Sequence, residues 1–120
     1  MKGRHAKWEV RLGSEAGRDL VRIVRRTRET FGLRQADVYA ETLRAALMAL
    51  EDGPDISGSK ARDDIRPGYR ILHVARGRRR GRHFVMYRAG DGVIVVLRIL
   101  HDAMDLARHV PKEVRGDDAE

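Results

Sequence analysis

The sequence predicts an α+β fold in which a helical hairpin packs on one face of an antiparallel sheet, with a short C-terminal helix. Two observations predict it. Apolar residues alternate near the start of the chain, recur at three- and four-residue steps through two long segments, and return to strand-like runs after Pro67. Short connections separate these segments, which favours antiparallel neighbours. The predicted order is β-α-α-β-β-β followed by the short helix.

The first strand and the first helix are both amphipathic. Apolar and polar side chains alternate over residues 8–12, which predicts a strand with one buried face. Gly13 ends the strand, and Ser14 is the expected N-cap of a helix over residues 15–31. Gly32 is a natural stop for this helix. Its apolar stripe consists of Ala16, Leu20, Ile23, Val24, Thr27 and Phe31.

A second helix is predicted over residues 33–51, again from apolar residues three and four positions apart. Gly53 and Pro54 end it. Because so few residues separate the two helices, they should form an antiparallel hairpin. The polar segment over residues 55–64 is interpreted as a loop.

Three strands are predicted at residues 69–75, 83–88 and 93–100, joined by short, glycine-containing connections. The last strand begins with a run that is apolar on both faces, so it should lie inside the sheet. The helices cover one face, and the other face is expected to be partly open. Asp102 is the expected cap of a last short helix that ends near His109.

Composition predicts one cytoplasmic domain. A chain of 120 residues is long enough for one hydrophobic core, so we predict a single domain over residues 1–110 and a flexible acidic tail over residues 111–120. No apolar run is long enough to cross a membrane, and residues 1–7 do not resemble a signal peptide. The chain has no cysteine, and its histidines lack metal-ligand spacing. We therefore expect neither a metal nor a cofactor.

The charge balance favours a polyanionic partner. Lys and Arg number 25 against 18 Asp and Glu, which gives a formal net charge of +7. A basic protein of this size attracts nucleic acids or acidic protein segments. Charge alone leaves both partners open, as well as a basic domain with no role in nucleic-acid binding. Aromatic residues make up only 5% of the chain, which gives little support to a base-stacking platform.

Three segments resemble the ParE/RelE superfamily of small bacterial toxins. Residues 64–70 resemble the family's entry to its first meander strand, and residues 82–88 resemble the next strand. Residues 96–109 are similar to the ParE-type ending. The resemblance implies a toxin of a type II toxin–antitoxin system, closest to ParE. It also implies a ribbon-helix-helix antitoxin, ParD-like, whose tail wraps the toxin in a hetero-oligomer.

The resemblance leaves the target open. Characterised ParE proteins poison DNA gyrase, whereas RelE-type relatives cut messenger RNA on the ribosome. Our leading hypothesis is a non-enzymatic toxin that binds gyrase. The alternatives are a RelE-like, ribosome-dependent endoribonuclease and a basic adaptor or inactive family member that only binds its partner.

Cleavage of RNA would need a base, an acid and cations near the phosphate. The candidates for this chemistry, which could converge on the open face of the sheet, are Arg66, Arg88, Arg98 and His101. A structural reading competes with the catalytic one. In it, His101 braces the corner between strand and helix, and Arg98 pairs with Asp102 or Asp105.

Exposed basic positions are the candidates for binding the target or the antitoxin. Five arginines occupy the seven positions 76–82, where they could track phosphates, grip an acidic antitoxin tail, or simply keep a hairpin tip soluble. The arginines of the first helix could bind an anion, although such a run is more often a solvated face. The candidate binding set is Arg76, Arg78, Arg79, Arg80, Arg82, Arg98, Met104 and Arg108.

Overall fold

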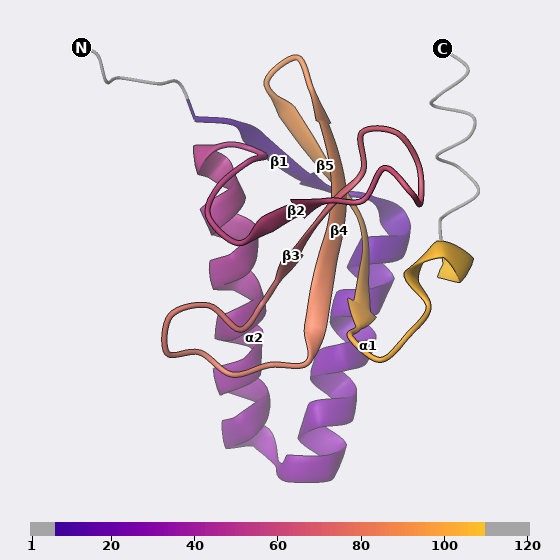
Figure 1. Cartoon of the computed structure of the whole chain (residues 1–120). Coiled ribbons are helices and arrows are strands. Elements are labelled where there is room, and N and C mark those ends of the chain that lie inside the picture. Colours follow the sequence, from indigo (N-terminus) through magenta and orange to yellow (C-terminus); the bar gives the residue numbers. More distant parts are fainter. Residues whose placement is uncertain (1–6, 110–120) are drawn as a thin grey trace.

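The computed structural model describes residues 7–109 (Figure 1). The predicted acidic tail over residues 111–120 therefore lies outside the described residues, as do the first six. The predicted α+β class is confirmed. Within residues 7–109 the elements are β1 (Glu9–Leu12), α1 (Ser14–Phe31), α2 (Leu33–Ala49), the 3-10 turn η1 (Leu50–Asp52), β2 (Ser59–Ala61), β3 (Arg70–His73), β4 (His83–Gly90), β5 (Val93–His101) and the 3-10 turn η2 (Leu106–His109).

Over the same residues the strands form one sheet in the order β1-β5-β4-β3-β2. The pairs from β5 to β2 are antiparallel, but β1 lies parallel to β5, with Glu9 opposite Val93. The prediction of a fully antiparallel sheet is wrong for this one pair. Alternation identifies β1 as a strand but not its neighbour. Because the whole helical hairpin separates β1 from the rest of the sheet, no tight turn dictates its direction.

Residues predicted as loop contain the edge strand β2, which pairs with β3. The side chain of Ser59 in β2 accepts a hydrogen bond from Arg70 Nε at 2.8 Å. The hydroxyls of Ser59 and Tyr87 also lie 2.6 Å apart and share a hydrogen bond. A strand of Ser, Lys and Ala has no apolar alternation, and the residues that place it are distant in the sequence, so the local pattern gives no signal for this strand.

β4 and β5 form the longest pairing of the sheet. Asp91 and Gly92 connect them with φ angles of 53° and 78°, as two-residue turns between antiparallel strands require. The connection is therefore shorter than predicted, and β4 extends to Gly90. β5 lies between β1 and β4, which confirms the prediction that its apolar run is internal.

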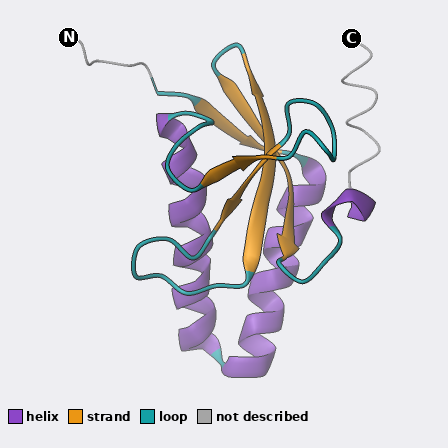
Figure 2. Ribbon diagram, in the orientation of Figure 1, coloured by secondary structure: helices purple, strands orange, loops and turns teal. Residues whose placement is uncertain are grey.

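The two helices pack side by side on one face of the sheet (Figures 1 and 2). The main core lies between them and the sheet, and it includes the fully buried Leu43, Leu72 and Val85. The opposite face carries a second cluster built around Met86 and Leu97, partly covered by Ile65 and Leu106. None of the helices within residues 7–109 has the length and apolar character needed to cross a membrane.

Two predicted helix caps are wrong. α1 begins at Ser14 itself, and Gly13 occupies the N-cap position. Asp102 starts no helix, because its carboxylate accepts hydrogen bonds from His73 Nε2 at 3.0 Å and from Arg82 Nε at 3.3 Å. Both donors are distant in the sequence, since His73 is 29 residues and Arg82 20 residues away from Asp102. Asp105 instead accepts a hydrogen bond from a backbone N–H at the start of η2.

Candidate functional site

A buried ion pair joins α1 to β5. The Asp19 side chain is 1% exposed and the Arg98 side chain 14%. Arg98 donates to both carboxylate oxygens, from Nε at 2.7 Å and from Nη2 at 2.9 Å. Burial alone would raise the pKa of Asp19, but the hydrogen bonds from Arg98 and from the Ile99 N–H hold this pKa below its ordinary value. Asp19 is therefore an ionised carboxylate locked in a two-point contact.

The same carboxylate caps the edge of the sheet. β1 ends where Leu12 lies opposite Val96, so β5 continues beyond its neighbour. The Ile99 N–H on that continuation donates to Asp19 Oδ2 at 2.9 Å. Asp19 thus occupies the position in which a further strand would place a carbonyl oxygen.

The expected partners of Arg98, Asp102 or Asp105, are corrected by this geometry. Asp19 lies 79 residues away in the sequence, out of reach of any argument from local spacing. Asp102 is engaged by His73 and Arg82, as described above. Arg98 also donates to the backbone oxygen of His109 at 2.9 Å, which fixes the turn η2 against β5.

The four candidate catalytic residues lie in three places in the molecule. Arg98 and His101 line one pocket between α1 and the end of β5. Arg88 lies opposite Val95, on the face turned away from the helices. It is five positions along β4 from His83, the residue paired with His101, and therefore about 17 Å from it along the strand. Arg66 lies in the turn that precedes β3.

Tyr39 fixes the protonation of His83. The Tyr39 hydroxyl lies 2.6 Å from His83 Nδ1 and accepts a hydrogen bond from the Arg82 N–H at 3.1 Å. We assign the Tyr39 proton to the hydrogen bond with Nδ1, which places the ring proton of His83 on Nε2. Burial, followed by the proximity of His101, lowers the pKa of His83 to about 4. His83 is thus a neutral imidazole at neutral pH, and in this assignment it carries its N–H on Nε2.

His101 braces the turn after β5, as expected. Its Nδ1 accepts the Ala103 N–H at 3.1 Å, which leaves the proton of the ring on Nε2. The His101 and His83 rings meet edge to face with centroids 5.4 Å apart. We name the cavity that both rings line, about 660 Å³ in volume, the α1–β5 pocket. Its lining residues include Arg22, Arg26, Thr27, Phe31, Arg98 and Met104.

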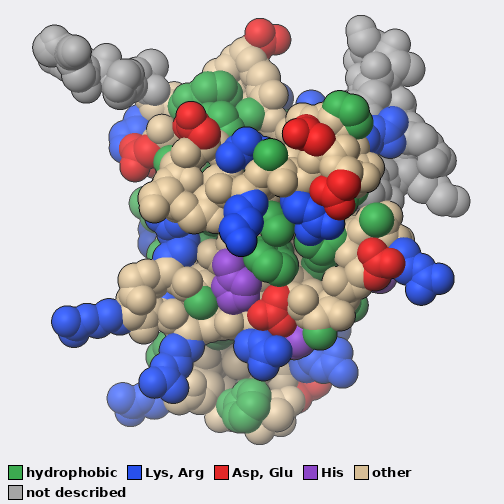
Figure 3. Space-filling view, in the orientation of Figure 1, with side chains coloured by type: hydrophobic (Ala, Val, Ile, Leu, Met, Phe, Trp, Pro, Cys, Tyr) green, Lys and Arg blue, Asp and Glu red, His purple; other side chains and the backbone are tan. Residues whose placement is uncertain are grey.

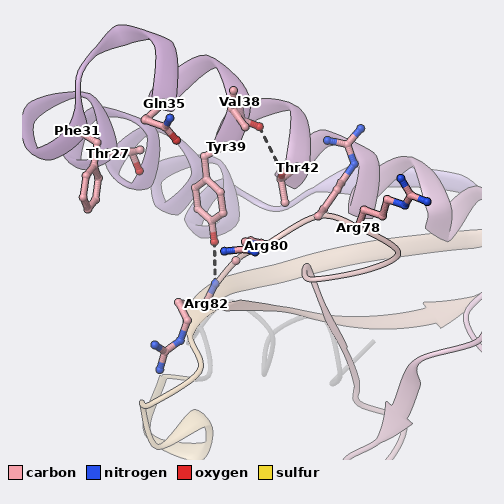
Figure 4. A pocket seen from close by; sticks show the side chains of 11 residues that line it. Thr27, Phe31, Gln35, Val38, Tyr39, Thr42, Arg78, Arg80 and Arg82 are labelled. Atoms are coloured by element: carbon pink, nitrogen blue, oxygen red, sulfur yellow. Dashed lines mark hydrogen bonds between the residues drawn. The ribbon is translucent and has the colours of Figure 1, made fainter.

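A second cavity of about 760 Å³ lies between the ends of the helices and the loop from β3 to β4 (Figure 4). We call it the loop groove. Phe31, Val38 and Tyr39 form its apolar side, and Arg78 to Arg82 form the other. The loop runs close to Tyr39, since a Cβ at Gly81 would lie 2.9 Å from the Tyr39 hydroxyl.

The loop arginines differ in their contacts. Arg76 donates to the Ser57 backbone oxygen at 2.6 Å, and Arg82 contacts Asp102. Arg78, Arg79 and Arg80 are exposed. In Figure 3, Lys and Arg side chains project at the lower left, where Figure 1 places this loop. Of the remaining binding candidates, Met104 lines the α1–β5 pocket and Arg108 is exposed on η2.

Three residues of this region were missed as site residues, namely Asp19, Tyr39 and His83. Asp19 had a detectable signal, because a carboxylate three residues after Ala16 and four before Ile23 falls on the apolar stripe of α1. Tyr39 falls on the apolar stripe of α2, where its hydroxyl gives no separate signal in the sequence. His83 opens a strand, and its partner Tyr39 is 44 residues away.

Comparison with known proteins gives a family. Residues 10–106 match the model of the ParE toxin of type II toxin–antitoxin systems, parDE. The ParE1 toxin of Mycobacterium tuberculosis is 38% identical over 85 residues, which are 70% of this chain and 79% of that protein. The ParE1 toxin of Caulobacter vibrioides is 30% identical over 100 residues, which are 83% of this chain and 95% of that protein.

Solved structures agree with the fold. The chromosomal ParDE toxin–antitoxin system of P. aeruginosa has a chain that matches with a TM-score of 0.66 and 18% identity, covering 81% of this chain and 98% of that one. The RelBE2 toxin–antitoxin complex of Mycobacterium tuberculosis matches with a TM-score of 0.51 and 25% identity, covering 79% and 98%.

Replacing Asp19 by Ala should destabilise the fold strongly. The change leaves the Arg98 guanidinium without its buried counter-charge and the Ile99 N–H without its acceptor. We expect the free energy of unfolding to fall by about 3 kcal/mol or more in urea denaturation. Asp37→Ala removes an exposed carboxylate from α2 and should change it by about 0.5 kcal/mol or less. Equal losses in the two variants would show that the buried pair has no special role.

A proton titration followed by nuclear magnetic resonance should find His83 neutral from pH 7 down to about pH 5, with a midpoint near its pKa of about 4. Between pH 6.5 and about 4 the unfolded chain binds a proton at His83 that the folded chain does not. The free energy of unfolding should therefore fall as the pH falls through this window. His83→Gln should remove this contribution. A midpoint near 6.5 for His83 would contradict the buried, Tyr39-bound imidazole.

Proposed function

The chain belongs to the ParE family of toxins from type II toxin–antitoxin systems, and from this premise we propose that it arrests growth by binding and inhibiting DNA gyrase. In this proposal a ParD-like, ribbon-helix-helix antitoxin neutralises it in a hetero-oligomer. Gyrase acts in the cytoplasm, so the proposal places the toxin there. The family match over residues 10–106 is the premise, and the geometry of the arginines supports the mode of action.

The observation that carries the proposal is the engagement of Arg98 by Asp19. In a nuclease, the Arg98 guanidinium would have to donate to a phosphate. Here its Nε and Nη2 atoms donate to Asp19 in a buried, two-point contact. His83, with a pKa of about 4, is a weak base at neutral pH. Binding without bond cleavage is the function that these contacts favour over RNA hydrolysis.

The loop groove is suited to an antitoxin segment that forms an amphipathic helix with acidic residues. Its apolar side, with Phe31 and Val38 both exposed, suits the apolar face of an amphipathic helix. The exposed arginines on its other side suit acidic residues along the same helix. β1 and β2 are the two outer strands of the sheet. An extended segment of a partner could pair with the main-chain N–H and C=O groups along the outer edge of either strand.

A supercoiling assay with purified gyrase tests the target. Titrating the full chain should inhibit supercoiling at micromolar concentration, and adding the antitoxin encoded beside the toxin should restore it. A translating extract treated with the same toxin should keep its transcripts intact. Unimpaired gyrase together with cleaved transcripts would overturn the proposal in favour of the RelE-like endoribonuclease.

A charge reversal tests the antitoxin surface. The triple variant Arg78→Glu, Arg79→Glu, Arg80→Glu should weaken binding of the antitoxin by about tenfold or more, because an acidic segment would meet like charges across the groove. The control reverses exposed arginines of α1 outside the groove, namely Arg18, Arg25 and Arg28. Calorimetric titration of both variants measures the difference. Equal weakening would mean that total charge, rather than the groove, attracts the antitoxin.

A further inference from the structure

We propose that the α1–β5 pocket binds a phosphate group of a single nucleic-acid strand, whose adjoining nucleotides lie along the loop groove in the toxin that has no antitoxin bound there. This site goes beyond the proposed inhibition of gyrase and does not depend on it. The inference begins with His83 and His101, whose rings line the pocket and lie 5.4 Å apart.

Both rings have only a donor left for a ligand. The Nδ1 atom of His83 is bound to the Tyr39 hydroxyl, and that of His101 accepts the Ala103 N–H. Each ring therefore keeps an Nε2–H and no free acceptor nitrogen. A ligand that meets these groups has to supply acceptors, as the oxygens of a phosphate do.

The charges around the rings have the sign that an anion needs. Arg22, Arg26 and Arg98 line the pocket, and Asp19 is the one carboxylate among its lining residues within the described part of the chain. Asp19 already receives hydrogen bonds from Arg22 and Arg98. Arg26 is exposed on α1, one turn beyond Arg22, with its guanidinium available to an anion. Three guanidinium groups thus line the pocket against one carboxylate. Two more carboxylates lie just outside it, Glu15 at 3.8 Å from Arg98 Nη1 and Asp102 at 3.6 Å from His101 Nδ1, and Asp102 is paired with Arg82. Four guanidinium groups against three carboxylates leave an excess of one positive charge, which Arg26 carries.

The neighbourhood of the pocket favours a nucleic-acid strand over an isolated carboxylate. Thr27 and Phe31 line both the α1–β5 pocket and the loop groove, so the two cavities adjoin. Phe31 is 69% exposed at this junction, where an unpaired base could stack on its ring. Beyond it lie Arg78, Arg79 and Arg80, which could meet the following phosphates. The surface therefore presents first the cations of the α1–β5 pocket, then the ring of Phe31, and then the loop arginines. This spatial order matches the phosphate–base–phosphate repeat of a single strand.

Fluorescence anisotropy with the full chain tests the site in the absence of gyrase, so its outcome is independent of the supercoiling assay. The probes are labelled single strands of oligothymidine and oligouridine of equal length. Binding should weaken as salt rises, and Arg26→Gln should weaken it severalfold and lower the slope against salt by about one. Arg25→Gln, on the adjacent exposed position outside the pocket, should leave it unchanged.

Two further variants separate the ring contacts from charge. His101→Asn keeps an oxygen that can accept the Ala103 N–H but removes the Nε2–H, so it should weaken binding while circular dichroism shows a folded chain. Phe31→Ala should weaken binding of both strands. The matched control is Leu33→Ala, because Leu33 is 65% exposed nearby but lines neither cavity.

The two probes identify the source of the phosphate. Tighter binding of oligothymidine would point to DNA, and tighter binding of oligouridine to RNA. The proposal is overturned if the affinity of the Arg26→Gln variant for both strands equals that of the Arg25→Gln variant. It is also overturned if an acidic peptide binds with the same dependence on Arg26 and His101 while the strands do not, because the pocket would then be a carboxylate site.

Discussion

The buried carboxylate of Asp19 holds the two layers of this molecule together at the point where the sheet loses its outer strand. It joins α1 to β5 through two hydrogen bonds from Arg98, and it receives the Ile99 N–H that β1 is too short to reach. A carboxylate that is 1% exposed is tolerated only because all of these donors surround it. The contact from Arg98 to the His109 backbone then ties the turn η2 to the same corner.

This contact decides which positive charges remain for partners. Arg98 belongs to the segment that most resembles the ParE-type ending, yet its guanidinium faces inward to Asp19. The exposed charge lies instead on the loop between β3 and β4 and on one side of α1. Both regions border cavities at the same end of the helical hairpin, with Phe31 between them. That arrangement favours recognition of an anionic partner over the assembly of an acid–base pair.

Much of the fold was predictable because its signals are local. The apolar period of α1 and α2, the glycine between them and the two-faced apolar run of β5 each specified an element. β2 and the parallel direction of β1 were not predictable, since polar contacts and distant neighbours define them. The candidate site divides in the same way. The bracing role of His101 follows from its place beside a turn, whereas Asp19 with Arg98 and Tyr39 with His83 meet across 79 and 44 residues of sequence.

The central claim is that Arg98 builds the fold and does not act on the target. The double variant Asp19→Asn, Arg98→Gln tests it most directly, because the two neutral amides can hydrogen-bond to each other and Asn can still accept the Ile99 N–H. The inhibition of gyrase supercoiling that we propose should be as strong for this variant as for the natural chain, when it is measured at a temperature where circular dichroism shows the variant folded. A folded double variant that has lost all inhibition would contradict the account and make the Arg98 guanidinium part of the toxic surface.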